Sequence, residues 1–253
     1  MKAILAIAKR ETGAYFSGPI GWICLIGFAG LSGLFFSLAL AGYASQAAEM
    51  GGMNQQDNVT NDLLRGFLGN LTIVLLLMVP ALSMGLIAAD RKERSIELLL
   101  TSPVPSWQIV LGKYMGGMAF ALVAVASTAY APAVLYWMGD PDRGVFLAVY
   151  GAFTLFIAVF MAVGLFASSL TENQLIALVL GFCLNLGLWI IGWGAQIAGE
   201  GKLKQAFDQA ALLSHFENLS SGVAHASDAV YFLSFIGFLL FATTQRVEAL
   251  RWR

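Results

Sequence analysis

The stretch that decides the fold is residues 90–113, D-R-K-E-R-S-I-E-L-L-L-T-S-P-V-P-S-W-Q-I-V-L-G-K, which lies between two long uncharged runs. It opens with three cations and three anions in eight residues, the only charge-dense stretch in the interior of the chain. The runs on either side, residues 66–89 and 114–139, are long enough to cross a bilayer, since a spanning helix takes ~20 mainly apolar residues. We therefore expect the charged stretch to join two membrane-spanning helices outside the membrane.

The composition of the whole chain is typical of a membrane protein. Of its 253 residues, 58% are hydrophobic and only 11% are charged, whereas roughly a quarter of the residues in a soluble domain are charged. Uncharged windows of spanning length recur along the sequence. They predict an all-α integral membrane protein, a single transmembrane domain over residues 1–253, with spanning helices at residues 20–43, 67–89, 114–138, 145–170, 173–198 and 224–245.

Two further segments are predicted to be helical without spanning the membrane. Residues 1–17 show an amphipathic pattern whose polar side carries Lys9, Arg10 and Glu11, and such a helix lies in the interface with its cations toward the headgroups of membrane lipids. Residues 199–223 show apolar residues at helical spacing. Four polar or aromatic residues in or just after that second segment are candidate contact residues: His215, Phe216, Glu217 and Asp228.

The distribution of basic residues predicts the orientation. With the N-terminus inside, ten of the 14 Lys and Arg residues fall on the inner side and the other four on the outer side. Cytoplasmic segments carry such an excess of positive charge. Both termini and the connecting segment at residues 90–112 are therefore predicted to be cytosolic, and residues 199–223 extracytoplasmic.

The connecting segment is the candidate functional site. A helix here would place Ile96, Leu99 and Leu100 on one side, exposed to the cytosol, and exposed apolar patches mark interaction surfaces. The alternative is a solvated loop that only keeps two helices apart. We favour a surface that docks a soluble partner, formed by Glu93, Arg94, Ser95, Ile96, Glu97, Leu98, Leu99, Leu100, Thr101, Ser102 and Pro103.

A few residues within the apolar runs are candidate hinges or path residues. Pro80 and Pro132 each remove a backbone donor from a predicted spanning helix, which makes them hinges or passive kinks. Asn185 either faces a translocation path or hydrogen-bonds a neighbouring helix. No Cys or His residues have the paired spacing of a metal site, so no metal is expected.

Several motifs resemble a known family. S-I-E-L-L-L-T-S-P-V at residues 95–104, followed by W-Q-I-V-L-G-K at residues 107–113, resembles the signature of ABC-2-type ABC transporter permeases. The resemblance extends over nearly the whole chain, and H-F-E-N-L-S-S-G-V at residues 215–223 is closest to the gliding-motility-type branch. One departure is that the family commonly has Gly-Thr where Arg94 and Ser95 stand.

The resemblance implies a type V exporter-like bundle with an N-terminal elbow helix and a cytosolic coupling helix. It implies a non-catalytic permease subunit in a bacterial inner membrane, paired with a second copy or a homologous permease and driven by a separate ABC ATPase that binds ATP and Mg²⁺. The chain has no G-x-x-x-x-G-K-[ST] phosphate loop of its own. The resemblance implies no cofactor in this chain and no nucleic-acid partner. The alternative function is a membrane scaffold, still coupled to an ATPase, that transmits force or signal to an extracytoplasmic accessory protein without moving a solute.

Overall fold

The computed structural model describes residues 2–49, 59–95, 104–138, 143–197, 201–220 and 226–251. Every regular element within these ranges is a helix, and six of the helical stretches are long and apolar enough to cross a membrane. The predicted all-α fold with six spanning helices is confirmed. The helices are α1 (Lys2–Ser17), α2 (Pro19–Glu49), α3 (Val59–Ser83), α4 (Gly85–Lys92), α6 (Ser106–Ala126), α7 (Tyr130–Met138), α8 (Arg143–Leu170), α9 (Gln174–Ile197), α10 (Lys202–Ala210), α11 (Leu212–Ser220) and α12 (Ala226–Leu250).

Two of the spanning stretches begin well before the predicted starts. The second runs over Leu63–Lys92 and the third over Ser106–Trp137, whereas the uncharged windows placed their starts at residues 67 and 114. Both helices include a basic residue at which the prediction stopped, and each of these residues has partners inside the protein. The Arg65 guanidinium donates from Nε to the carbonyl of Ser220 at 2.7 Å, and Lys113 is held by carboxylates.

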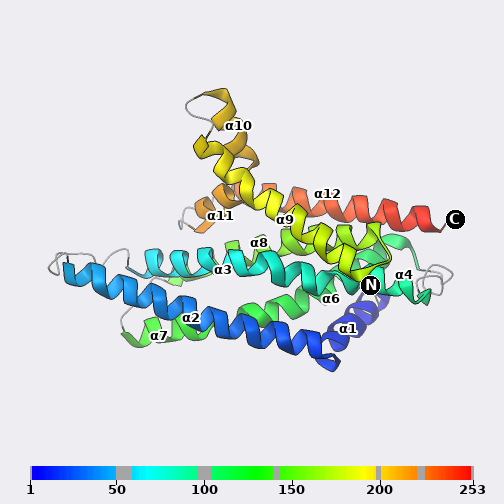
Figure 1. Cartoon of the computed structure of the whole chain (residues 1–253), viewed down its shortest axis with the longest axis horizontal. Helices are drawn as coiled ribbons and strands as arrows, with labels where there is room; N and C mark the ends of the chain where they lie inside the picture. Colours follow the sequence, from blue (N-terminus) through cyan, green and yellow to red (C-terminus); the bar gives the residue numbers. More distant parts are fainter. Residues whose placement is uncertain are drawn as a thin grey trace.

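The helices form an elongated bundle with both chain termini at one end (Figure 1). That end, which we call the termini end, also carries α1 and α4, and α1 packs mainly along α6. α10 stands away from the bundle, joined to it through α9 and α11 (Figure 1). The short helices α10 and α11 thus fall within residues 199–223, the segment that the sequence predicted to be helical without crossing the membrane.

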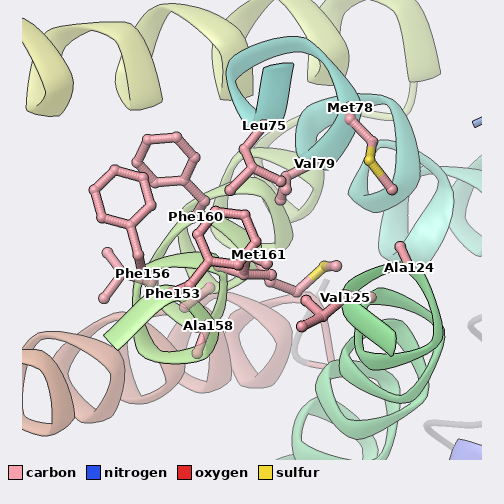
Figure 2. Close-up of a cluster of buried hydrophobic side chains, with 14 of the residues drawn as sticks. Leu75, Met78, Val79, Ala124, Val125, Phe153, Phe156, Ala158, Phe160 and Met161 are labelled. Carbon is pink, nitrogen blue, oxygen red and sulfur yellow. The ribbon is translucent and has the colours of Figure 1, made fainter. Parts of the chain in front are cut away.

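The core is organised around α8, which packs against α3, α4, α6, α9, α11 and α12. Its aromatic side chains Phe153, Phe156 and Phe160 are fully buried, and Figure 2 shows them beside Leu75 and Val79 of α3. α2 has the opposite character, because most of its apolar side chains are exposed. Its exposed face is suited to lipid or to another bundle.

The third spanning stretch is interrupted between α6 and α7. Pro132 lacks the N–H that would bond the carbonyl of Thr128, four residues earlier. That carbonyl instead accepts hydrogen bonds from the Tyr150 hydroxyl on α8 and from the N–H of Ala131, each at 3.0 Å. The carbonyl that Pro132 leaves without its helical partner is therefore hydrogen-bonded, in part by α8. A role for Pro132 as a hinge stays a prediction.

Candidate functional site

Four charged side chains meet at the termini end, and we call them the charge cluster: Arg10, Glu11, Asp90 and Lys113. The Nζ of Lys113, on α6, lies 2.6 Å from Oδ2 of Asp90 on α4 and 2.9 Å from Oε1 of Glu11 on α1. Nη2 of Arg10 lies 2.6 Å from the same Glu11 oxygen and 3.4 Å from the same Asp90 oxygen. The charge cluster thus joins three helices that are far apart in the sequence.

Burial makes these contacts mutually dependent. The Lys113 side chain is only 2% exposed, whereas that of Arg10 is 51% exposed. A buried charge is tolerated when it is paired and hydrogen-bonded, and the two cations and two anions of the charge cluster sum to zero. The hydrogen bond to Glu11 raises the pKa of Arg10, so this guanidinium stays charged. Removing one member would leave a buried charge without its counter-charge.

Small residues on α6 let α1 come close enough to make these contacts. A Cβ added at Gly112 would lie 2.8 Å from Cβ of Ile7, and one at Gly116 would lie 2.5 Å from Cβ of Glu11. The hydroxyl of Thr12 donates to the carbonyl of Gly116 at 3.2 Å. Glycines four apart allow this kind of close helix–helix approach, and so α1 lies directly on α6.

A break between α3 and α4 lies next to the charge cluster and is held by α8. The Ser168 hydroxyl accepts hydrogen bonds from the N–H groups of Ile87 at 3.1 Å and Ala88 at 3.0 Å, and it donates to the carbonyl of Met84 at 2.8 Å. The first N–H groups of a helix have no partner within it, so this side chain completes the start of α4. The break follows Pro80 by four residues, and its use as a hinge stays a prediction.

The same break contacts α1. The Tyr15 hydroxyl donates to the carbonyl of Leu82 at 2.8 Å. Burial raises the pKa of Tyr15 above its ordinary value, so its phenol keeps the proton that it donates. This hydrogen bond therefore ties α1 to the end of α3.

Replacing Ser168 with alanine should destabilise the protein by about 1–3 kcal/mol, because the buried N–H groups of Ile87 and Ala88 would lose their acceptor. Unfolding of the purified protein in mild detergent measures the change. Ser169→Ala is the matched control, since that neighbouring hydroxyl, among the described residues, bonds only the carbonyl of Phe166 in its own helix. Equal stabilities of the two variants would contradict this role for Ser168.

The candidate residues at the opposite end form a link between short helices. Nδ1 of His215 lies 2.6 Å from Oδ1 of Asp228, and Nε2 donates to the carbonyl of Gln209 at 3.0 Å. The imidazole also stacks on the ring of Tyr231 at 4.0 Å. These contacts join α10, α11 and α12, and Phe216 is buried next to them while Glu217 is exposed. His215 and Asp228 are therefore structural partners, although Oδ2 of Asp228 is buried without a hydrogen bond to any described residue.

Asn185 lies in the interior, on the side of α9 that faces α8. It is fully buried, its Nδ2 lies 3.5 Å from the carbonyl of Phe160, and its Oδ1 has no hydrogen-bond partner among the described residues. A long contact of this kind is weak. A role for Asn185 in a translocation path stays a prediction.

The comparison with family models decides the class of the protein. The model described as ABC-2 family transporter protein matches residues 5–245, which include both the charge cluster and the outer helices. The chain belongs to this family. A comparison with curated proteins found no match. Membership implies a membrane subunit that pairs with an ABC ATPase subunit.

In this ABC-2 transporter, the predicted coupling residues begin where α4 ends. Glu93 is the C-cap of α4, and Arg94 follows with φ of 56°, a left-handed conformation that glycine adopts most easily. The left-handed conformation of residue 94 explains why a glycine, as the family commonly has there, would suit this position. The Ser95 hydroxyl donates to Oδ1 of Asp90 at 3.1 Å. The remaining predicted residues, 96–103, lie outside the described residues.

The structure also corrects how the first helix uses its polar residues. The sequence placed Lys9, Arg10 and Glu11 together on a polar face, but Glu11 turns toward Lys113, and Lys9 is exposed. Sequence reasoning did not select Asp90 and Lys113 as site residues. The available signal was a lysine directly after Gly112, at the start of an apolar run, because a charge within a spanning helix requires a partner.

Proposed function

We propose that the chain is the permease subunit of an ATP-driven exporter, in which a separate ABC ATPase subunit binds ATP and Mg²⁺ and pushes on residues 93–103. The observation that carries this proposal is the charge cluster. It ties the end of α4, the first part of α6 and α1 together directly beside that segment. A push there would move α1 and the spanning helices on both sides of the segment at once, and the family match supports this coupling.

The proposed setting is a bacterial inner membrane with both termini in the cytoplasm. The excess of Lys and Arg on that side supports this orientation, as does the position of both termini at one end of the bundle (Figure 1). The chain would pair with a second copy or with a homologous permease. Exposed apolar side chains on α2 and α9, such as Ile23, Ile26 and Leu175, support such a contact. In this proposal the chain binds no cofactor and catalyses no reaction.

A second candidate function is a scaffold, coupled to an ATPase, that transmits force to an extracytoplasmic accessory protein, as in the gliding-motility branch. The observation that favours it is the position of α10, which stands off the bundle (Figure 1) with exposed residues along its length. Retention of an extracytoplasmic protein through α10 and α11, without solute movement by the assembled complex, would select this function.

Reversing one charge in the coupling segment tests the main proposal. Glu97→Lys should leave membrane insertion intact but reduce the ATPase that co-purifies with the tagged protein in mild detergent, because it places a cation in the proposed docking surface. ATP hydrolysis in the eluate measures the effect. Glu217→Lys is the matched control, since that carboxylate is exposed at the opposite end. Normal assembly and ATPase activity with Glu97→Lys would refute the docking assignment.

A further inference from the structure

A cavity of about 550 Å³ opens at the termini end beside the charge cluster. It lies between α1, the start of α2, the α3–α4 break and the start of α9. Its polar lining includes Arg10, Asp90 and Glu93, and its apolar lining includes Leu82 and Leu86. A cavity with one charged side and one apolar side suits an amphipathic ligand.

The charged side offers both signs to such a ligand. Among the described residues, Arg10 makes its ion pairs through Nη2 alone, which leaves Nε and Nη1 to donate to a phosphate. The charge cluster is neutral as a whole, so Glu93 adds one negative charge to the lining. A zwitterion that carries a phosphate and an ammonium group matches this arrangement.

An apolar groove continues from the cavity along the bundle. This second cavity, of about 190 Å³, lies between α2 and α3 and is lined by apolar side chains such as Phe28, Leu77 and Met78. Ala81 lines both cavities, so the two adjoin. The acyl chain of a lipid is already out of water in a bilayer or micelle, so the groove would hold it through van der Waals contacts with these apolar side chains. The groove leads away from the charges, in the direction that an acyl chain would take.

We propose that the two cavities together hold an aminophospholipid. Its phosphate binds Arg10, its ammonium group binds Glu93, and one acyl chain lies in the groove between α2 and α3. A phosphoethanolamine headgroup fits better than phosphocholine, because only a primary ammonium can donate hydrogen bonds to the Glu93 carboxylate. The assignment of this lipid to the inner leaflet rests on the orientation proposed above, but the binding itself does not.

The test is native mass spectrometry of the full chain in mild detergent, with equal amounts of dioleoyl phosphatidylethanolamine, phosphatidylcholine and phosphatidylglycerol. The wild type should retain one phosphatidylethanolamine in preference to the other two. Gly27→Leu should lower this retention about tenfold, because the acyl chain would lose its van der Waals contacts with the groove. Gly27 lines the groove and has open space at its Cβ, so the new side chain would fill the groove without a clash.

Two further variants separate the parts of the proposal. Gly30→Leu is the matched control, because Gly30 is also on α2 with open space at its Cβ but does not line the groove. It should bind like the wild type.

Glu93→Gln should keep a bound lipid but lose the preference for ethanolamine over choline. Equal retention in the Gly27 and Gly30 variants, or a preference for phosphatidylglycerol, would overturn the proposal. No ATPase is present in this assay, so its outcome does not depend on the proposed export function.

Discussion

Replacing Lys113 with methionine is expected to destabilise the protein by about 3–5 kcal/mol, because it removes the cation that pairs with two carboxylates in a mostly buried site. Methionine matches the length of the aliphatic stem, so the loss would report on charge and not on packing. Arg10 alone would then face Glu11 and Asp90. Unfolding of the purified protein in mild detergent measures the change.

A second substitution distinguishes lost ion pairing from general damage. Adding Asp90→Asn to Lys113→Met leaves Arg10 and Glu11 as a balanced pair, so the double variant should recover most of the lost stability. Asp90→Asn alone leaves one excess cation and should also destabilise the protein. If the two single losses simply added in the double variant, the charge cluster would not be acting as a unit.

Gly116→Ala is expected to loosen α1 from α6 and to destabilise the protein by about 1–3 kcal/mol, the usual cost of overpacking. The new Cβ would lie 2.5 Å from Cβ of Glu11 and 3.0 Å from the carbonyl oxygen of Ala8, and the backbone atom cannot move aside alone. Trypsin should then cleave faster after Lys9 and Arg10 in the variant than in the wild type.

The matched control for this change is Gly151→Ala on α8, where an added Cβ meets nothing within 4 Å. Alanine is favoured over glycine within a helix by ~0.5–1 kcal/mol, so this control should be at least as stable as the wild type. Rapid cleavage in both variants, or in neither, would contradict the close contact of α1 with α6.

The spanning helices could be predicted because their signal is local. A run of ~20 apolar residues has few alternatives to a membrane helix, and all six such stretches are helical in the structure. Their ends were harder to predict, since a helix can include a charged side chain that has partners in the protein. Lys113 has such partners, and α6 begins at Ser106, before the predicted start at residue 114.

The site could be predicted only in part, because its contacts join distant segments. The charge-dense segment after the second span follows from sequence, but the pairing of Lys113 with Glu11 spans 102 residues and leaves no periodic pattern. The same limit applies to Ser168, which completes the start of α4 from a helix some 80 residues away. Pro80 marked the neighbourhood of a break, yet the chain breaks at Met84, where Ser168 supplies the missing hydrogen bonds.

The charge cluster also has a consequence for how the chain is made. Synthesis proceeds from the N-terminus, so both carboxylates that pair with Lys113 leave the ribosome before Lys113 does. When α6 packs against α1 and α4, Lys113 therefore meets counter-charges that have already been made, and its burial between these helices is neutralised as it occurs. The order of the residues along the chain thus ensures that this lysine is buried only with its counter-charges present.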